Sequence, residues 1–313
     1  MKESPLVQPF SALTKADTSI AGGKGASLGE LTQAGLPIPQ GFVILSSAFE
    51  QFLKETDLNV EIDAILHTVD HQNMLTVEKA SEQIHALILQ AKMSQNIAQT
   101  ILTHFKKLNT PFVAVRSSAT AEDSASAAWA GQLDSFLNTT EHTLLHNVKR
   151  CWASLFTPRA IFYRFEKGLH TEKISVAVVV QKMIASEVSG IAFSVHPVTQ
   201  DHNQIIIEAG YGLGEAIVSG QITPDSYVLE KNPRRIIDKN INHQEKGIYR
   251  KQEGDNEWTT ISPSKATLQK LSDKQILDLT TLILHIEQHY GFPCDIEWAF
   301  EKENFFILQS RPI

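Results

Sequence analysis

The stretch that decides the fold is CDIEWAFEKENFFILQSR, residues 294–311, in which two alternating segments flank a short polar interval. Alternation of apolar and polar side chains over 4–8 residues is typical of a β-strand with one buried face. One face of the first segment, Cys294–Phe300, carries Asp295, Glu297 and Ala299, and the other carries Ile296, Trp298 and Phe300. The second segment, Phe305–Arg311, alternates in the same way. We therefore expect a β-hairpin at the end of the chain.

The register of this hairpin follows from keeping its two faces distinct. A three-residue loop, Lys302-Glu303-Asn304, with Asn304 in the left-handed region, gives one polar and one apolar face. A two-residue loop sets Glu297 against Leu308 and mixes the faces, because a slip of one residue exchanges the faces of a strand. The three-residue loop predicts four pairs: Glu297 with Gln309, Asp295 with Arg311, Trp298 with Leu308, and Phe300 with Phe306.

The polar face of the hairpin has the chemistry of a magnesium–phosphate site. Carboxylate and amide oxygens suit Mg²⁺, which is normally held by one or two carboxylates together with substrate phosphates. Glu297 and Gln309 are therefore candidate magnesium ligands, and the Arg311 guanidinium suits a phosphate oxygen. The alternative is a half-exposed hairpin with one ordinary salt bridge, and the hairpin alone leaves that alternative open.

Composition narrows the class of protein. The 313 residues, 42% of them hydrophobic, are enough for a well-buried core and two lobes. A net charge of −7 with scattered basic residues argues against a nucleic-acid surface. No apolar run approaches the ~18 residues of a membrane span, and MKESPLVQPF is not a signal peptide. Cys151 and Cys294 are too few for a disulfide framework, so a cytoplasmic location is expected.

Helix-like and strand-like segments alternate along the chain, which predicts an α+β fold. Helices are expected at Ala26–Ala34, between about Ala48 and Leu108, from the Thr157 cap to Phe165, and from the Ser272 cap to Tyr290. Strands are expected at Phe112–Arg116, Ile174–Gln181, Gly190–Ser194 and Ile205–Ile207, with turn-rich hairpins from Val228 to Thr260. The strand Ile174–Gln181 is apolar on both faces, so it should be central and mark the seam between lobes at 1–180 and 181–313.

Two loops are candidate phosphate sites. Gly22-Gly23-Lys24-Gly25 precedes a helix, so its backbone can approach an anion, although it is not a Walker A loop. Arg116 ends a buried strand and enters a run of small residues to Gly131, which could close over a phosphate. The alternatives are a plain glycine turn and a surface arginine before a linker. Glu122 and Asp123 are expected to be solvated loop acids.

Several other patterns are set aside. Glu208–Gly214 has the spacing G-x-G-x-G and no βαβ unit, so we expect a glycine-rich turn near the site and no nicotinamide cofactor. His285 and His289 lack the H-E-x-x-H spacing of zinc proteases, and His142 and His146 have no third ligand in view. All four are expected on solvated helix faces, and His196 is expected to cap a turn.

Taken together, the ordered segments resemble the ATP-grasp nucleotide-binding domain of the phosphoenolpyruvate synthase and pyruvate, phosphate dikinase family, which includes the rifampin phosphotransferases. The matching blocks cover nearly the whole chain: GGKGASLGEL with PIPQGFV, VAVRSSATAED with AGQLDSFLN, CWASLFTPRAIFYR, VVVQKMIASEVSGIAFSVHPVT, IIEAGYGLGEAIVSGQITPDSY and IEWAFEKENFFILQSRPI. The regions near 50–108 and 232–265 stay unassigned. Six blocks in the family's order are a specific signal, whereas any one of them is weak.

The resemblance implies a role for each candidate residue. Lys24, Arg116 and Arg311 would hold phosphates and act in catalysis, with Asp295 orienting Arg311. Gly131 and Ser135 would belong to the phosphate-covering loop. Glu297 and Gln309 would hold Mg²⁺. The adenine slot would be lined by Gln181 and by the backbone of Lys182, Met183 and Ile184.

The sequence also departs from the family pattern. Members continue into a swivelling domain with a phosphoryl-accepting histidine and usually into an acceptor-binding domain, and no comparable histidine occurs here. His196 stands where Asn or Asp is common, and Trp129 stands where phenylalanine is frequent. The expected function is therefore the ATP-binding half of a dikinase-type phosphotransferase, a transferase that passes the β-phosphoryl group to a histidine elsewhere. A non-catalytic nucleotide-binding regulatory protein and an ADP-forming ATP-grasp ligase are the alternatives.

Overall fold

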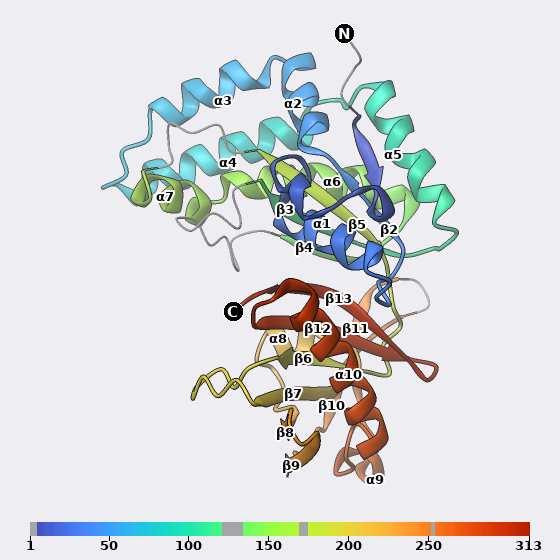
Figure 1. Ribbon diagram of the computed structural model, residues 1–313. Helices are drawn as coiled ribbons and strands as arrows, with labels where there is room; N and C mark the ends of the chain where they lie inside the picture. The colour runs from blue at the N-terminus through green and yellow to red at the C-terminus, as the bar shows by residue number, and fades with distance from the viewer. Residues whose placement is uncertain (1–4, 121–133, 169–174, 252–253) are drawn as a thin grey trace. The chain divides into compact units, whose positions relative to one another are not determined.

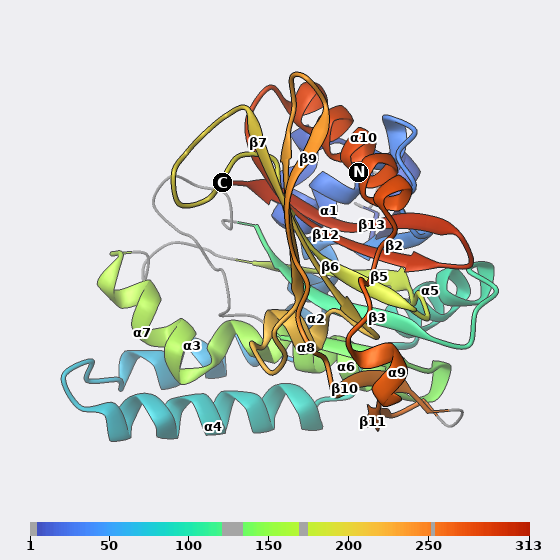
Figure 2. The ribbon, with the colours of Figure 1, turned by 90° about the horizontal axis from the view of Figure 1, so that it is seen from below.

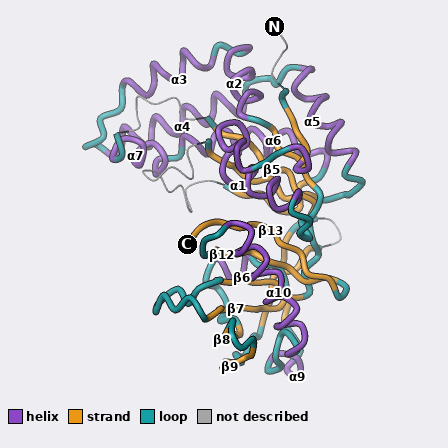
Figure 3. The backbone as a smooth tube through the Cα atoms, viewed as in Figure 1, coloured by secondary structure: helices purple, strands orange, loops and turns teal. Residues whose placement is uncertain are grey.

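A computed structural model describes residues 5–120, 134–168, 175–251 and 254–313 (Figure 1). The chain divides into two compact units, one comprising Met1–Glu30 and Gln40–Met183 and the other Leu31–Pro39 and Ile184–Ile313. Helix and strand are mixed in both, as Figure 3 shows, so the predicted α+β class is confirmed. The two-lobed ATP-grasp fold and the lobes 1–180 and 181–313 remain predictions. Within the described ranges, every helix is too short or too polar to cross a lipid bilayer.

The first unit is built on a five-stranded sheet. Its strand order is β1 (Val7–Pro9), β2 (Gly41–Ile44), β5 (Val176–Lys182), β3 (Val113–Ala119) and β4 (Ser135–Thr139). The central strand is β5, and its residues Val176 to Gln181 are all buried. This confirms the prediction from its apolar pattern, because a strand covered on both sides has no polar face.

Helices cover one face of this sheet in a thick apolar layer. The described apolar residues of this layer come from six helices and one 3₁₀ turn: α2 (Ser46–Glu55), α3 (Leu58–His67), α4 (Met74–Gln90), α5 (Gln95–Lys107), α6 (Glu141–Ala153), α7 (Pro158–Glu166) and η3 (Ser154–Phe156). Trp152 is fully buried there and packs between Phe49 and Phe52. Thr157 Oγ1 accepts from Ala160 N, so the predicted cap of α7 is confirmed. The opposite face carries α1 (Thr18–Gln33), which follows η1 (Phe10–Ala12) and η2 (Lys15–Asp17).

The second unit is built on a six-stranded antiparallel sheet. Its strand order is β13 (Asn304–Pro312), β12 (Cys294–Glu301), β6 (Val188–Phe193), β7 (Gln204–Tyr211), β8 (Asp225–Glu230) and β9 (Arg235–Asn240). Helix α10 (Asp273–Tyr290) packs on its apolar face (Figure 2). Ser272 caps this helix in a capping box and Gly291 ends it, both as predicted. A separate ribbon, β10 (Lys246–Arg250) and β11 (Asn256–Thr260), and the short helices α8 (Glu215–Val218) and α9 (Pro263–Ala266) complete the unit.

The closing hairpin turns differently from the prediction. Its loop has two residues, Lys302 and Glu303, both with positive φ (49° and 63°), and Asn304 already belongs to β13. Two residues with φ > 0 match the right-handed twist of the flanking strands. The expected three-residue loop is therefore wrong, as are the pairs Trp298–Leu308 and Phe300–Phe306.

A β-bulge restores the polar pairs that the shorter loop would have displaced. Trp298 pairs with Ile307 and Glu297 with Gln309, so Leu308 is the extra residue opposite the step between them. A bulge adds one residue to one strand and shifts the register beyond it by one. The predicted pair of Glu297 with Gln309 and that of Asp295 with Arg311 are consequently both present.

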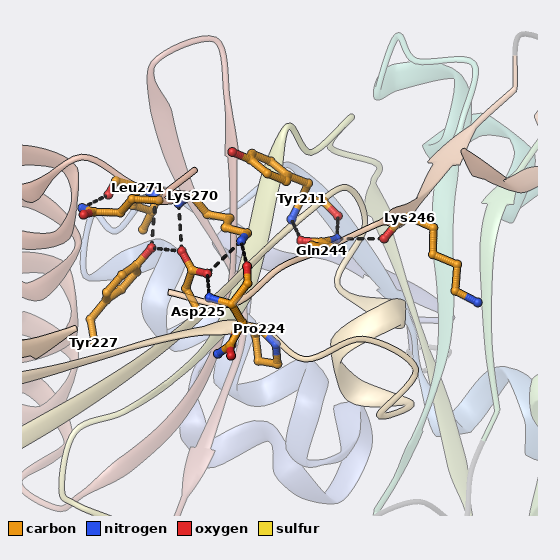
Figure 4. Close-up of polar contacts among 10 residues, drawn as sticks. Tyr211, Pro224, Asp225, Tyr227, Gln244, Lys246, Lys270 and Leu271 are labelled. Atoms are coloured by element: carbon orange, nitrogen blue, oxygen red, sulfur yellow. Dashed lines mark hydrogen bonds and ion pairs between the residues drawn. The ribbon is translucent and has the colours of Figure 1, made fainter. Parts of the chain in front are cut away.

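A fully buried ion pair fastens β8 to the segment before α10 (Figure 4). Lys270 Nζ lies 2.8 Å from Asp225 Oδ1, and both side chains are 0% exposed. The carboxylate also accepts from Tyr227 OH at 2.8 Å, Lys270 N at 2.9 Å and Asn242 N at 2.9 Å. The ammonium also donates to the Asn242 carbonyl and lies over the Tyr211 ring. Such a pair is stable only because its remaining hydrogen-bonding capacity is satisfied.

Replacing one member of this pair should destabilise the second unit strongly. Asp225→Asn keeps the shape but leaves a buried ammonium without its counter-charge, which costs about 3–5 kcal/mol. Lys274→Met is the matched control, because it removes only a solvent-exposed pair with Asp278, and such pairs contribute little to stability. The measurement is urea denaturation of both variants. Equal midpoints for the two variants would contradict the assignment.

Candidate functional site

A break in helix α1 places the predicted Gly-rich loop. Gly22 has φ 69° and ψ 169°, which is not helical, so the helix stops and restarts there. A Cβ at Gly22 would lie 2.1 Å from Ser118 Oγ and 2.4 Å from the Ser118 carbonyl oxygen. Only glycine permits that approach and that backbone conformation. The loop therefore lies directly against β3, although the prediction had the helix begin after it.

One face of the five-stranded sheet collects the polar residues predicted for the first unit. Arg116 in β3 pairs with Ser135 in β4 and with Val179 in β5. Directly paired residues of antiparallel strands point to the same side, and so do residues two apart in a strand. Arg116, Ser135, Ser118 and Gln181 therefore share one face, opposite the helical layer.

Helix α1 brings Lys24 to this same face. A Cβ on Gly25 would lie 3.0 Å from Val43 Cγ2, and Val43 pairs with Val179 on that side of the sheet. Gly25 N also donates to Ser118 Oγ at 3.3 Å. Lys24 therefore belongs to a helix that packs on the face of the sheet carrying Arg116, the other predicted phosphate residue of this unit. The predicted Gly131, along with Trp129, Glu122 and Asp123, lies outside the described residues.

Gln181 is the most unusual side chain on this face. It is 1% exposed, and its amide nitrogen Nε2 is buried with no hydrogen-bond partner among the described residues. A buried unpaired amide costs about 1–3 kcal/mol, so the Gln181 amide calls for a partner such as a water molecule, an ion or a ligand. An acceptor nitrogen of a purine ring has the right chemistry for this donor.

Two backbone N–H groups in the segment predicted to line the adenine slot already have partners. Lys182 N donates to the Gln40 carbonyl at 2.8 Å, and Met183 N donates to the Phe112 carbonyl at 3.1 Å. These two N–H groups are already used within the first unit. Ile184 begins the longer segment of the second unit and is 7% exposed. A ligand at Lys182–Ile184 would therefore be met by carbonyl groups or by the Ile184 N–H.

The second unit carries the predicted magnesium and phosphate residues on β12 and β13. Arg311 Nε donates to Asp295 Oδ2 at 2.8 Å, and Arg311 Nη2 lies 2.6 Å from the same oxygen. The Asp295 side chain is 13% exposed and that of Arg311 is 51% exposed. The carboxylate therefore anchors one edge of the guanidinium and leaves the rest accessible, which is the orienting role predicted for it.

A second glutamate, which sequence reasoning did not select, joins this polar face. Glu208 in β7 pairs with Ile191 in β6, which pairs with Glu297 in β12, which pairs with Gln309 in β13. These four residues form one row across the sheet. The backbones of the two glutamates are two strands apart, which corresponds to about 10 Å. Burial, and secondarily the nearby Asp295 carboxylate, raise the pKa of Glu208.

Glu208 follows three isoleucines, and the Gly-rich turn predicted to begin at Glu208 is strand as far as Tyr211. The available signal in the sequence was a single carboxylate after a short apolar strand. The glycines that follow it suggested a turn, and a residue in a turn is not expected to be part of a sheet. Among the described residues, no three His, Cys, Asp or Glu side chains lie close enough to hold a metal alone.

The histidines lie as the sequence suggested. His196 Nδ1 accepts from Val198 N at 3.3 Å and Thr199 N at 3.2 Å, so this ring caps a turn. The four helical histidines are exposed on the surfaces of α6 and α10: His142, His146, His285 and His289. None of the five contributes to the polar faces described above.

Comparison with known proteins connects these faces to a family. A family model described as the pyruvate phosphate dikinase AMP/ATP-binding domain matches residues 18–313. The chain is 42% identical over 308 residues to the probable phosphoenolpyruvate synthase of Methanocaldococcus jannaschii, covering 96% of this chain and 26% of the relative. It is 38% identical over 353 residues to the phosphoenolpyruvate synthase of Pyrococcus furiosus, covering 97% and 43%.

A relative with a different acceptor in its name is similar over the same region. The rifampicin phosphotransferase of Bacillus subtilis is 36% identical over 319 residues, covering 99% of this chain and 36% of the relative. The chain therefore spans between about a quarter and less than half of the length of these relatives.

The raised pKa of Glu208 predicts a stability that depends on pH. Burial disfavours the ionised form of Glu208 and raises its pKa in the folded state. The ionised Glu208 side chain therefore lowers the stability of the fold most at pH values above that raised pKa. Glu208→Gln should therefore melt at a higher temperature than the unsubstituted chain at pH 7. The difference should shrink as pH falls through the raised folded pKa towards the unfolded pKa of about 4.3, below which the glutamate is protonated in both states.

Thermal unfolding of the ligand-free protein between pH 4.5 and 8 measures this effect. Glu301→Gln is the control, because it makes the same substitution elsewhere in the same sheet. Glu301 lies on β12 about 13 Å along the strand from Glu297, the residue in the row of Glu208. A gain for Glu208→Gln that does not change with pH would show that the pKa of Glu208 is ordinary.

Proposed function

The chain belongs to the pyruvate phosphate dikinase AMP/ATP-binding domain family, as its motifs predicted, and from that membership we propose that it binds Mg-ATP for a dikinase-type phosphoryl transfer. The observation that carries the proposal is the pairing of Glu297 with Gln309 beside an Arg311 that Asp295 holds in place. A carboxylate oxygen, an amide oxygen and a guanidinium on one strand pair are the groups that a magnesium-bound phosphate requires.

The donor set fits magnesium. Glu297 and Gln309 would hold the ion through oxygen atoms, and Glu208 is the next carboxylate in the same row. When bound, Mg²⁺ neutralises phosphate oxygens and so favours attack on phosphorus. The raised pKa of Glu208 supports this assignment, because a nearby cation would offset the cost of ionising a half-buried carboxylate.

The first unit would bind the remainder of the nucleotide. Lys24 and Arg116 lie on one face of its sheet and would contact the phosphates, with Ser135 paired beside Arg116. Gln181 would donate its unpaired amide hydrogen to the adenine ring. The chain's own contribution is then position and charge: three cationic groups, Lys24, Arg116 and Arg311, offset the negative charge of the transferring phosphoryl group.

We propose that the reaction is completed by a histidine outside this sequence. The β-phosphoryl group of ATP would pass to that histidine on a swivelling domain and water would take the γ-phosphoryl group, leaving AMP and inorganic phosphate. A further domain would bind the final acceptor. The supporting observation is that the relatives named above are two to four times longer than the matched region. We further propose the ATP-grasp fold for the two units and a cytoplasmic setting, in which both buried cysteines stay reduced.

Magnesium-dependent binding tests the metal assignment. Glu297→Gln removes one anionic ligand and should weaken Mg-ATP binding by at least about tenfold, the size of effect seen even for groups that only support metal ligands. Binding of ATP in the presence of a chelator should change little, because the substitution leaves the cationic groups intact. Isothermal calorimetry measures both, with Glu301→Gln as the control. Equal losses with and without magnesium would contradict the role of Glu297.

Product analysis tests the reaction class. The 313-residue chain should form AMP and phosphate from ATP only when a histidine-bearing swivelling domain of a relative is added, because the proposed acceptor histidine lies outside this sequence. Nucleotides are resolved by ion-exchange chromatography after incubation with and without that domain. ADP formed by the chain alone would contradict a dikinase-type reaction. Tight binding without transfer under any condition would favour a regulatory nucleotide-binding protein.

A further inference from the structure

The second part of helix α1 begins without a cap of its own. Gly22 is the non-helical residue before this part, so Gly23, Lys24 and Gly25 are its first three helical residues. The residue in the position of Gly22 normally supplies a side-chain oxygen to the second or third of these N–H groups. Glycine has no side chain, so the capping oxygen must come from elsewhere.

Ser118 supplies the missing oxygen from a distant strand. Its Oγ accepts from Gly25 N at 3.3 Å across 93 residues of sequence, and Gly25 occupies the third helical position. The serine is 0% exposed and pairs with Ala177 in the central strand β5, so the sheet fixes its position. The hydroxyl thus does from β3 what an N-cap side chain does locally.

The contact of Ser118 with the loop has two points, and Lys24 lies between them. Gly22 approaches both Oγ and the carbonyl oxygen of Ser118, and Gly25 donates to Oγ. The backbone that carries Lys24 is therefore held on both sides by one residue. A lysine side chain is long and flexible, so a fixed backbone is what limits the positions of its ammonium group.

We propose that Ser118 is a positioning residue that holds Lys24 for binding the phosphates of ATP. The inference rests on the proposed function, since it assigns the phosphates to Lys24. It predicts that Ser118 contributes to ATP affinity through Lys24 and not by contact with the nucleotide.

The neighbouring serine provides a matched comparison. Ser117 points to the other side of β3, donates to the Asp134 carbonyl at 2.8 Å and lies 3.0 Å from Ser154 Oγ. It is as buried as Ser118, at 1% exposed, and belongs to the same strand. A Ser117→Ala substitution therefore removes a buried hydroxyl from β3 without touching the Gly22–Gly25 loop.

A double-mutant cycle on Mg-ATP affinity tests the proposal. Ser118→Ala should weaken binding by about tenfold, within the range expected for loss of a helix cap. Ser118→Cys should give the same loss with nearly the same volume, because a thiol is a weak acceptor. Lys24→Met should also weaken binding, and adding Ser118→Ala to Lys24→Met should cause no further loss. Ser117→Ala should leave the affinity within about twofold of the unsubstituted chain.

The possible outcomes distinguish failure of the positioning role of Ser118 from failure of the proposed ATP-binding function. Additive losses in the double variant would show that Ser118 acts independently of Lys24, and unchanged affinity of Ser118→Ala would show that it does not position the site; either result overturns this inference alone. An unsubstituted chain that does not bind Mg-ATP overturns the proposed function and this inference with it. Melting temperatures of the same samples report any general loss of folding.

Discussion

The alternation of side chains along β12 and β13 is the constraint on which the candidate site depends. The side chains of Ile296, Trp298 and Ile307 join the core beneath α10, and this burial forces Asp295, Glu297 and Gln309 to the other side. A slip of one residue would exchange the faces and place carboxylates in the core. The bulge at Leu308 reconciles this requirement with the tight turn at Lys302-Glu303. The polar face is thus a consequence of burying the apolar one.

Much of the fold could be predicted because its signals are local. The Ser272 and Thr157 caps, the apolar stripe of α10 and the fully apolar strand β5 each lie within one stretch of the chain. The two polar pairs of the hairpin were also predictable, since burial decides which residues must face each other. The loop length was not, because two geometries give the same pairs near Glu297 and a bulge distinguishes them.

The rest could not be predicted because it depends on residues far apart in sequence. Glu208 reaches the row of Glu297 only through the order of four strands, and no spacing in the chain encodes that order. The segment Leu31–Pro39 belongs to the second unit although its neighbours on both sides belong to the first, because Leu31 and Leu36 pack in the second core and Ile307 N donates to Pro37. Neither unit is therefore a continuous stretch of chain.

The capping of α1 by Ser118 also has a consequence for the order of events during synthesis. Gly23 and Gly25 have low helix propensity and Gly22 is not helical, so this segment depends on its contacts with β3 to keep its shape. Ser118, whose hydroxyl caps this segment, is synthesised 93 residues after Gly25. At a synthesis rate of roughly 5–20 residues per second, the delay is about 5–20 s. Until β3 is made and pairs with β5, which comes later still, the nascent chain has the loop sequence without its geometry. The geometry of the loop is thus acquired late in translation, when the central strand closes the sheet.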